Sequence, residues 1–346
     1  MNKKILKIIT IILVILLCLA GLVVLYVYNL MDKINYEDFS ETNVIKELNL
    51  EDIQDDDLIE EDIIYSELEQ INASDIEWSI TDIKEKDKNI INVLLLGVEA
   101  IGGGRGRTDA MIIATINKSE KSLKLTSLMR DIYVQIPGHK SNKLNSVYGK
   151  GGVSLLVETI QQNFGVPIDG AFLVNFNSFE KLIDIVGGVE IELTQKEAKY
   201  LNSTNYISNK ENRNLEAGIN HLNGNQALGY ARVRKINGLY GHSDFGRTGR
   251  QRAILNSLFN KYKEKSLPEL FPIAEEILPL ITTDFNKLEI LKLLTLVIDL
   301  NINEITQLRI PIDKHYKSTN VSKAYMLVPE WDINLKTLHD FIYGIK

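Results

Sequence analysis

The pattern of apolar and polar positions divides the chain into three parts, and the first is an unbroken apolar run. Residues from Ile8 to Tyr28 carry no charge. Such a helix is about 31 Å long at roughly 1.5 Å per residue, which matches the hydrocarbon thickness of a bilayer. The run is too long for the core of a cleaved signal peptide. We therefore predict a transmembrane signal-anchor helix over residues 8–30.

Charges on either side of this run predict its orientation. Lys3, Lys4 and Lys7 precede it, and a strongly acidic segment follows it. Because cytoplasmic flanks carry the excess of lysine and arginine, residues 1–7 are expected in the cytoplasm and the main domain outside, in a single-pass protein of the cell membrane. The acidic segment, residues 31–89, mixes isoleucine and leucine with acids. Between residues 34 and 90 it has 19 acidic and 4 basic side chains, so we expect a solvated extracytoplasmic spacer with short helical patches.

Beyond residue 90, short apolar runs alternate with segments of helical period. The expected strands are residues 91–96, 110–116, 123–128, 171–176 and 189–193, and the expected helices are residues 153–164, 178–186, 224–230 and 246–262, with further helical segments after Leu267. This alternation predicts an α/β layered sandwich, a central mixed sheet flanked by helices. We assign residues 90–262 to a catalytic core and residues 263–346 to helices and strands that complete the same domain.

Arginine shows where the candidate chemistry lies. The chain has 10 arginines, and eight of them fall in three groups, at positions 105, 107, 130, 232, 234, 247, 250 and 252. The planar guanidinium group binds phosphate or carboxylate oxygens in pairs, whereas lysine would suffice for solubility. For Arg250 and Arg252, exposure to solvent or contact with a glycan is as plausible as a phosphate role. The whole chain has a net charge of −7, yet the part beyond residue 90 is basic and suits an anionic partner.

The charged motifs occupy strand ends and helix starts. Arg107 and Asp109 precede the second expected strand, and Arg130 and Asp131 follow the third. In open α/β proteins such strand ends collect ligands. Arg232 and Arg234 share a face if the chain is extended there, but would diverge by about 200° on a helix. Arg247 and Gln251 are four residues apart and share one helical face.

The sequence lacks the residue spacings that are typical of nucleotide-binding, zinc and serine-hydrolase sites. The glycine loop at residues 102–106 has no G-x-G-x-x-G pattern and leads into a strand, which argues against a nucleotide-binding fold. The five histidines show no zinc-ligand spacing, and no serine lies in a G-x-S-x-G turn. Cys18 is the sole cysteine and lies in the apolar run, so no disulfide framework is possible.

Ordered motifs across residues 90–262 resemble the LytR-CpsA-Psr family of envelope glycopolymer transferases. They are Asn92 to Gly97, Arg107 to Met111, Ser127 to Asp131, Ile136 to Gly138, Lys143 to Asn145, Gly151-Gly152, Asp184 to Val189, Tyr230 to Arg234 and Asp244 to Gln251. The resemblance implies transfer of a phosphoglycan, such as a teichoic acid or capsular polymer, from a polyprenyl-pyrophosphate carrier to peptidoglycan. The implied partners are that lipid-linked glycan, the peptidoglycan acceptor and the membrane, with no nucleic acid.

The resemblance also implies roles for individual residues. The pyrophosphate would lie among Arg107, Arg130, Lys143, Arg232, Arg234, Arg247 and Gln251, and the lipid tail would fill a tunnel between the sheet and its helices. A magnesium ion (or Mn²⁺) would be held by Asp109 and a second aspartate, in whose place this chain has Glu99. Asp109 or Asp244 would accept or orient the acceptor hydroxyl proton while the other orders the arginines.

Two other activities stay open at this point. A membrane-tethered regulatory protein, or attenuator, would only hold polyprenyl phosphates, and a hydrolase would cleave the same lipid pyrophosphate with water. All three predict the same arginine site, because each has to bind a diphosphate. They differ in product, since only transfer yields a polymer linked to an acceptor.

Overall fold

The computed structural model describes residues 28–30, 32–39, 68–79, 84–101, 104–322 and 324–344. Within these residues, no helix is long and apolar enough to cross a bilayer. The predicted anchor, residues 8–30, lies outside the described part of the chain except for its last three residues.

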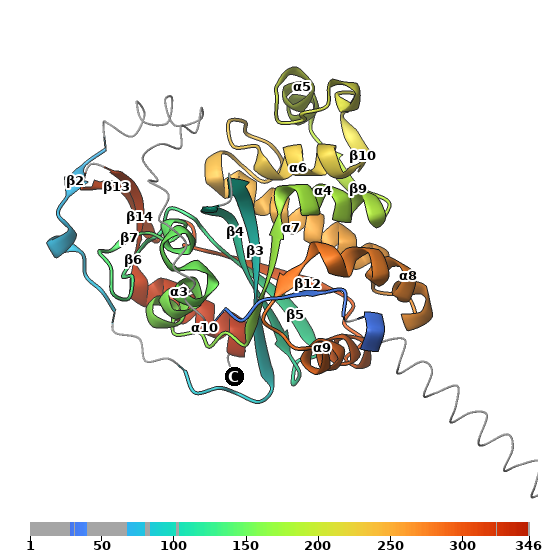
Figure 1. Ribbon diagram of the computed structural model, residues 1–346. Helices are drawn as coiled ribbons and strands as arrows, with labels where there is room; N and C mark the ends of the chain where they lie inside the picture. The colour runs from blue at the N-terminus through green and yellow to red at the C-terminus, as the bar shows by residue number, and fades with distance from the viewer. Residues whose placement is uncertain are drawn as a thin grey trace, which may run out of the picture.

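A mixed seven-stranded sheet forms the centre of the molecule, as the sequence predicted (Figure 1). The strand order is β1-β11-β8-β3-β4-β5-β12. Antiparallel pairs join β3 to β4, β4 to β5 and β11 to β8, whereas β8 runs parallel to β3, β12 to β5 and β1 to β11. The strands are β1 (Asn35–Tyr36), β3 (Ile90–Ile101), β4 (Gly104–Asn117), β5 (Ser122–Leu128), β8 (Gly170–Asn175), β11 (Thr282–Thr283) and β12 (Ile305–Ile310).

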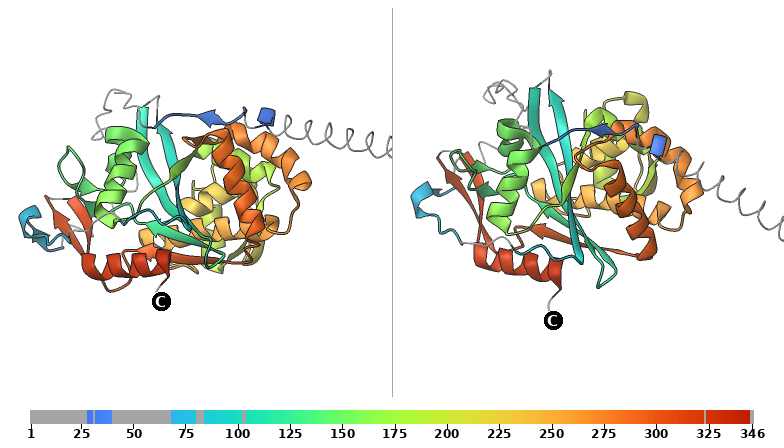
Figure 2. Two further views of the ribbon diagram at one scale, coloured as in Figure 1. Left: turned by 90° about the horizontal axis from the view of Figure 1, so that it is seen from below. Right: turned by 60° about the horizontal axis from the view of Figure 1, so that its bottom comes forward.

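Helices cover both faces of this sheet, which explains its apolar composition. One face packs against α3 (Ser146–Phe164) and α10 (Trp331–Tyr343), and the other carries α4 (Phe176–Ile185), α6 (Gly224–Arg232), α7 (Ser243–Tyr262), α8 (Leu267–Ile277) and α9 (Lys287–Asp299) (Figures 1 and 2). Side chains of β3 point alternately to the two faces of the sheet. Leu94 and Leu96 pack in the cluster with α3 and α10, whereas Val93 packs on the other face with Phe285 and Ile290.

Smaller elements complete the fold around these layers. A further helix is α5 (Gln195–Ser203), and 3-10 turns occur at Ala73–Asp75, Lys210–Asn212 and Leu278–Leu280. Three small sheets are β9 (Val189–Leu193) with β10 (Gly218–Leu222), β6 (Tyr133–Val134) with β7 (Asn142–Lys143), and β2 (Gln70–Ile71) with β13 (Tyr316–Val321) and β14 (Ala324–Pro329). A cluster from β9, β10, α5, α6 and α7 forms a second core above the sheet.

The described parts of the predicted spacer are not a solvated stalk. Asn35–Tyr36 pairs with β11, and Gln70–Ile71 pairs with β13. Phe39 and Ile76 are buried, and the Trp78 ring lies 5.7 Å from that of Trp331. These apolar side chains gain more from packing than from solvation, so these parts of residues 31–89 belong to the folded domain.

The glycine-rich turns also differ in detail from the sequence interpretation. β3 and β4 keep pairing as far as Ile101 and Gly104, so the predicted glycine loop is shorter than expected. The Gly151-Gly152 pair interrupts α3, where Gly152 has φ of +67°. Because that conformation favours glycine, it explains why two glycines stand inside a helix.

Candidate functional site

A β-bulge between β3 and β4 carries the central carboxylate of the site. Gly97 pairs with Ala110, but Val98 pairs with Thr108, so Asp109 is an extra residue on its strand. Bulges re-aim side chains and are frequent next to active sites. Glu99 lies at a second irregularity on β3, between Val98 and Ala100, and is half-buried. Both predicted metal ligands therefore lie near the same end of the β3–β4 pair, at two separate irregularities.

Four further segments bring charged side chains to the site. Arg130 and Asp131 directly follow β5, and Lys143 ends β7. Helix α6 ends at Arg232, and Val233 then adopts an extended conformation (φ −59°, ψ 130°) that leads to Arg234. Asp244, Arg247 and Gln251 all come from α7. The site thus joins residues that lie more than 140 positions apart in the chain.

Tight packing of glycines fixes the start of α7. The helix begins at Ser243, so Asp244 lies inside its first turn and does not act as an N-cap. A Cβ added at Gly246 would lie 2.4 Å from the carbonyl oxygen of Gly241, and one at Gly249 would lie 2.5 Å from Tyr240 Cβ. Only glycine allows the preceding loop to fold back this closely. This packing places Asp244 and Arg247 next to Asp109 on β4.

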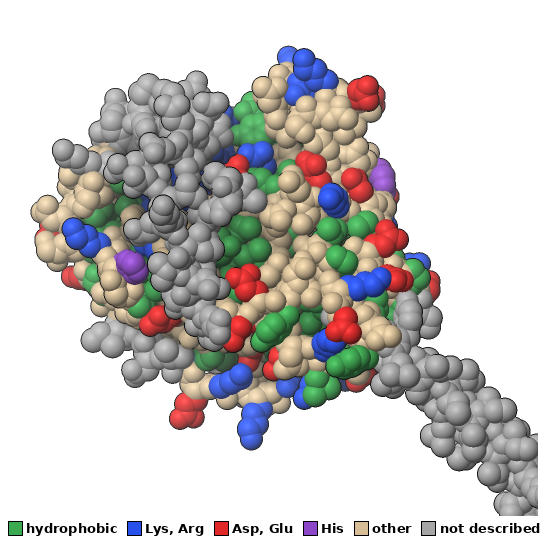
Figure 3. Space-filling model, viewed as in Figure 1, with side chains coloured by type: hydrophobic (Ala, Val, Ile, Leu, Met, Phe, Trp, Pro, Cys, Tyr) green, Lys and Arg blue, Asp and Glu red, His purple; other side chains and the backbone are tan. Residues whose placement is uncertain are grey.

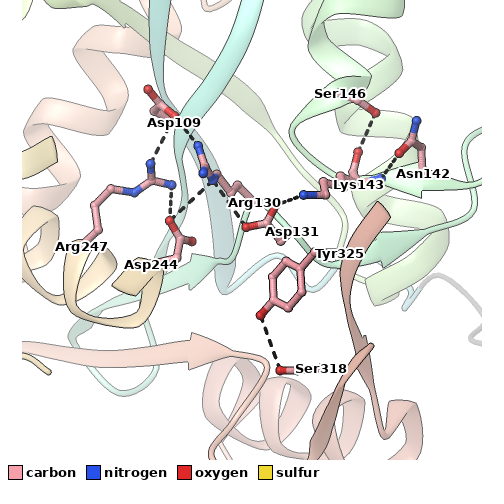
Figure 4. A network of polar contacts seen from close by, with 10 residues as sticks. All are labelled: Asp109, Arg130, Asp131, Asn142, Lys143, Ser146, Asp244, Arg247, Ser318 and Tyr325. Carbon is pink, nitrogen blue, oxygen red and sulfur yellow. Dashed lines mark hydrogen bonds and ion pairs between the residues drawn. The ribbon is translucent and has the colours of Figure 1, made fainter. Parts of the chain in front are cut away.

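Arg130 and Arg247 hold Asp109 between them (Figure 4). Arg247 Nη1 lies 3.3 Å and Arg130 Nη1 3.4 Å from Asp109 Oδ1. The guanidinium group of Arg247 also pairs with Asp244 at 2.5 Å, and Arg130 Nε lies 3.7 Å from the same carboxylate. Gln251 Nε2 donates to the carbonyl oxygen of Asp109 at 3.4 Å. The two arginines and two aspartates form one connected ion-pair cluster.

Asp131 extends this cluster to Lys143. Arg130 Nε lies 3.4 Å from Asp131 Oδ2, and Lys143 Nζ lies 2.8 Å from Asp131 Oδ1. The Lys143 ammonium also sits 5.5 Å from the centre of the Tyr325 ring. Burial by itself raises the pKa of Asp131, but Lys143 and Arg130 outweigh it and hold that pKa at about 2. Asp131 is therefore a structural anion that positions two of the cations.

The electrostatic balance keeps Asp109 ionised. Burial raises the pKa of this carboxyl, but Arg247, Arg130, Arg234 and Arg232 together hold it below its usual range. The same burial lowers the pKa of Arg247, and Asp244 opposes that shift. A base with a depressed pKa accepts a proton weakly near neutral pH. Asp109 is better suited to hold cations in place than to abstract a proton.

Not all predicted residues join the cluster equally. Arg232 and Arg234 lie near enough to lower the pKa of Asp109, and the Arg232 guanidinium stacks 4.9 Å from the centre of the Phe176 ring. Arg107 lies two residues before Asp109 on β4 and is half-buried, and among the described residues it forms no ion pair. The structure therefore gathers Arg130, Lys143, Arg232, Arg234 and Arg247 around three aspartates, with Arg107 beside them.

Arg250 has a structural role instead of contact with phosphate or glycan. Its side chain is fully buried, pairs with Glu197 at 3.2 Å, and donates to the carbonyl oxygens of Val233 and Ile236 at 3.0 and 3.3 Å. These bonds hold the segment after α6 that carries Arg234. Arg252, also on α7, donates to Ser127 at 2.7 Å and to Gln307 at 3.0 Å.

An apolar hollow of about 370 Å³ opens beside the ion-pair cluster. It lies between strands β3, β4 and β8 and helices α4, α6 and α7, and it is lined by side chains such as Leu96, Phe172, Leu182, Leu228 and Ile254. Asp109, Arg232, Arg247 and Gln251 also line it and supply its charged groups. Such a site fits a ligand with an anionic head and a hydrocarbon tail.

Sequence reasoning did not identify two sets of residues at the site. The resemblance implied a lipid tunnel between the sheet and its helices, but the apolar side chains that line the hollow look like ordinary core, so no sequence signal marks them. Tyr325 lies in the C-terminal part of the chain, 182 residues after Lys143, and no motif marks it. Asp131 lies within a motif that the sequence analysis named, and the structure pairs it with Arg130.

Comparison with known proteins agrees with this geometry. TagV of Bacillus subtilis (strain 168), a polyisoprenyl-teichoic acid–peptidoglycan teichoic acid transferase, is 32% identical over 218 residues, which cover 61% of this chain and 53% of that protein. TagU of Bacillus licheniformis, a transferase of the same description, is 36% identical over 194 residues, covering 56% of this chain and 58% of its own length. The match thus spans about half the length of these relatives.

A solved structure and a family model extend the likeness. The crystal structure of B. subtilis TagV superposes with a TM-score of 0.59 at 28% identity, covering 75% of this chain and all of that one. The model of the LytR_cpsA_psr family matches residues 59–337, beyond the motif-bearing core at both ends. The chain therefore belongs to the LytR_cpsA_psr family.

Proposed function

We propose that this protein transfers a phosphoglycan from a polyprenyl-pyrophosphate carrier to peptidoglycan. The observation that carries the proposal is the cation cluster at the apolar hollow. Five cations surround three aspartates among the described residues, which favours a polyanionic head, and the hollow suits its polyprenyl tail. The names of the relatives TagV and TagU, teichoic acid transferases that act on peptidoglycan, support the same substrates.

The cluster suggests how the reaction proceeds. Breaking a pyrophosphate with a sugar hydroxyl requires neutralisation of charge on the bridging and leaving oxygens. Arg130 and Arg247 present preorganised donors, and Arg247 Nε is buried without a hydrogen bond to any described residue. Arg232 and Arg234 approach from the α6 side. Asp109 orders the arginines, and Asp244 is our choice to accept or orient the hydroxyl proton. Its Oδ1 pairs with Arg247, whereas its Oδ2 is buried without a hydrogen bond to the described residues.

Analysis of products tests this function. The purified full-length chain, given a lipid-pyrophosphate glycan donor and a peptidoglycan fragment, should yield a glycan covalently joined to that fragment. Mass spectrometry of lipid extracted from the protein should find a polyprenyl phosphate or pyrophosphate. Free glycan phosphate formed equally well without acceptor would indicate a hydrolase. Intact donor bound without turnover would indicate a regulatory binding protein.

We further propose that Glu99 and Asp109 hold a magnesium ion against the pyrophosphate. Among the described residues, no group of three His, Cys, Asp or Glu side chains could hold a metal by itself. Magnesium, however, is commonly held by one or two carboxylates together with substrate phosphates. Two carboxylates near the same end of the β3–β4 pair match that donor set. When bound, the ion would neutralise charge on the phosphate oxygens.

Replacing Glu99 with alanine should weaken magnesium binding by roughly tenfold or more in the presence of the pyrophosphate lipid, as loss of a metal-site group does. Titration calorimetry measures this directly, and magnesium-dependent transfer should fall in parallel. Glu190→Ala, at an exposed position of β9, is the matched control and should change neither. Wild-type transfer that survives chelation unchanged would show that the metal role is wrong.

We also propose that the chain is a single-pass membrane protein with residues 1–7 in the cytoplasm and the described domain outside. The uncharged run over residues 8–28 and the three lysines before it support this orientation. A reporter that is active only outside the cytoplasm should work when fused after residue 90. Activity of a cytoplasm-only reporter at that position would contradict the assignment.

A further inference from the structure

Helix α9 exposes a row of large apolar side chains. Leu288, Leu294 and Ile298 are 60%, 45% and 43% exposed. At about 100° per residue they fall within an arc of about 120°, so they form one face. On the other side of the helix, Leu293 packs against the cluster of Val93, Phe285 and Ile290. The helix is thus attached to the domain by one face and presents a second apolar face outward. Figure 3 shows apolar side chains at the surface in this part of the molecule.

The same helix contacts the described residues that end the predicted anchor. Lys287, the first residue of α9, places its ammonium 4.0 Å from the centre of the Tyr28 ring and forms an ion pair with Asp32. Leu30 packs in one cluster with Ile290. Because the uncharged run ends at Tyr28, the surface of the bilayer should lie within about one turn of the start of α9.

Contacts farther along hold the chain there. Lys33 pairs with Glu275 on α8 at 2.5 Å, and Asn35 Nδ2 donates to the Pro279 carbonyl oxygen at 2.7 Å. Strand β1 then hydrogen-bonds with β11. The link between the predicted anchor and the domain is therefore short and fixed by side-chain and backbone contacts, so the domain has little freedom to move away from the bilayer.

We propose that α9 lies on the outer surface of the membrane, with Leu288, Leu294 and Ile298 inserted at the boundary between head groups and acyl chains. The proposal rests on the membrane anchor proposed above. Amphipathic helices bind membranes in this way through an apolar face and flanking basic residues. Lys292 is exposed on the same helix and is placed to extend its ammonium group to lipid phosphates. Tyr28 suits the same level, where tyrosine is enriched.

This placement explains how the hollow could meet its lipid. Ile281, which lines the hollow, accepts a hydrogen bond from Asn35 N of β1 at 3.3 Å. Part of the apolar lining therefore adjoins the strand that follows the anchor. A polyprenyl chain could enter from that side, while its diphosphate is held at Asp109 and the arginines.

Spin labels on single cysteines test the contact with lipid. In a Cys18→Ser background, cysteine replaces Ile298, or Ile219 as the matched control, because Ile219 on β10 is also an exposed isoleucine, at 79%. The full-length chain is placed in phosphatidylglycerol and phosphatidylcholine vesicles. We expect the label at 298 to be several-fold more accessible to oxygen, and less accessible to a water-soluble nickel complex, than the label at 219. Equal accessibilities in an anchored chain would overturn the proposal. If the protein does not stay with the vesicles, both the proposed anchor and the proposed contact of α9 with the membrane are wrong.

Activity provides a second measurement. Leu288→Asp with Ile298→Asp should lower turnover of a donor embedded in vesicles by roughly tenfold, since two apolar side chains no longer enter the interface. Turnover of a short-chain, water-soluble donor should stay unchanged, as should both activities in Ile219→Asp. Equal losses with both donors, or no loss with either, would overturn the proposal. A labelled chain that inserts but transfers nothing would instead count against the proposed function.

Discussion

Replacing Arg130 with lysine is expected to remove 2–4 kcal/mol of transition-state stabilisation, about the cost of losing one preorganised donor to a developing anion. Arg130 lies 3.4 Å from Asp109, 3.4 Å from Asp131 and 3.7 Å from Asp244, so one planar group orders three carboxylates beside the hollow. Lysine keeps the charge but cannot offer paired donors in a plane. Turnover of a polyprenyl-pyrophosphate glycan donor with a peptidoglycan-fragment acceptor measures the loss.

Two companion variants make this result specific. Arg232→Lys should lose rate as well, because Arg232 approaches the site from α6, where it stacks on Phe176. Arg213→Lys should transfer at the wild-type rate, because Arg213 lies outside the site and hydrogen-bonds with Ile207 and Asn205. If Arg130→Lys and Arg232→Lys lower the melting temperature but transfer at the wild-type rate, the arginines only neutralise buried carboxylates and the proposed mechanism is wrong.

Replacing Arg250 with methionine should destabilise the fold by about 3–5 kcal/mol, the usual cost of removing one partner of a buried ion pair. The variant leaves Glu197, only 1% exposed, without its cation, and it frees the carbonyl oxygens of Val233 and Ile236. Denaturant unfolding of the wild type and the variant gives the difference in free energy.

The charge on Glu197 can be separated from loss of packing. Adding Glu197→Leu to Arg250→Met removes the uncompensated anion, so the double variant should recover part of the lost stability. Arg213→Met, a half-buried arginine elsewhere, should cost no more than about 1 kcal/mol. If Arg250→Met costs no more than this control, the buried pair contributes nothing to stability.

Four strands of the central sheet, β3, β4, β5 and β8, were predictable because they are apolar runs with clear limits. The fifth expected strand is β9, which pairs with β10 in a separate sheet, and β1, β11 and β12 were not expected. The expected helices correspond to α3, α4, α6 and α7. The packing of the acidic segment against the domain was not predictable. Ile76 and Trp78 lie among many acidic residues, and the acidic composition of the whole segment indicates a solvated spacer. Besides Tyr133 of β6, the apolar partners of these two residues come from β13, β14 and α10, more than 240 residues later.

In the site, too, contacts between neighbours on one helix were predictable, whereas contacts with residues far away in the sequence were not. The i, i+4 spacing correctly grouped Arg247 with Gln251, and both contact Asp109. Arg250 stands one turn from Arg247 and has the same residue type, but its partner Glu197 lies 53 positions away on α5. Sequence spacing reports which residues share a helical face; it does not report what that face meets.

The pairing of β12 with β5 also bears on the order in which the chain folds. β5 ends at Leu128, but its parallel partner begins at Ile305, so that edge of the sheet stays open until nearly the whole chain has been made. An unpaired apolar strand edge invites pairing with other chains. Contacts so distant in sequence also slow folding, because a long loop must close first. A polypeptide ending at residue 262 would lack β11, β12 and α10. The motif-rich core therefore depends on its C-terminal segment to complete the sheet.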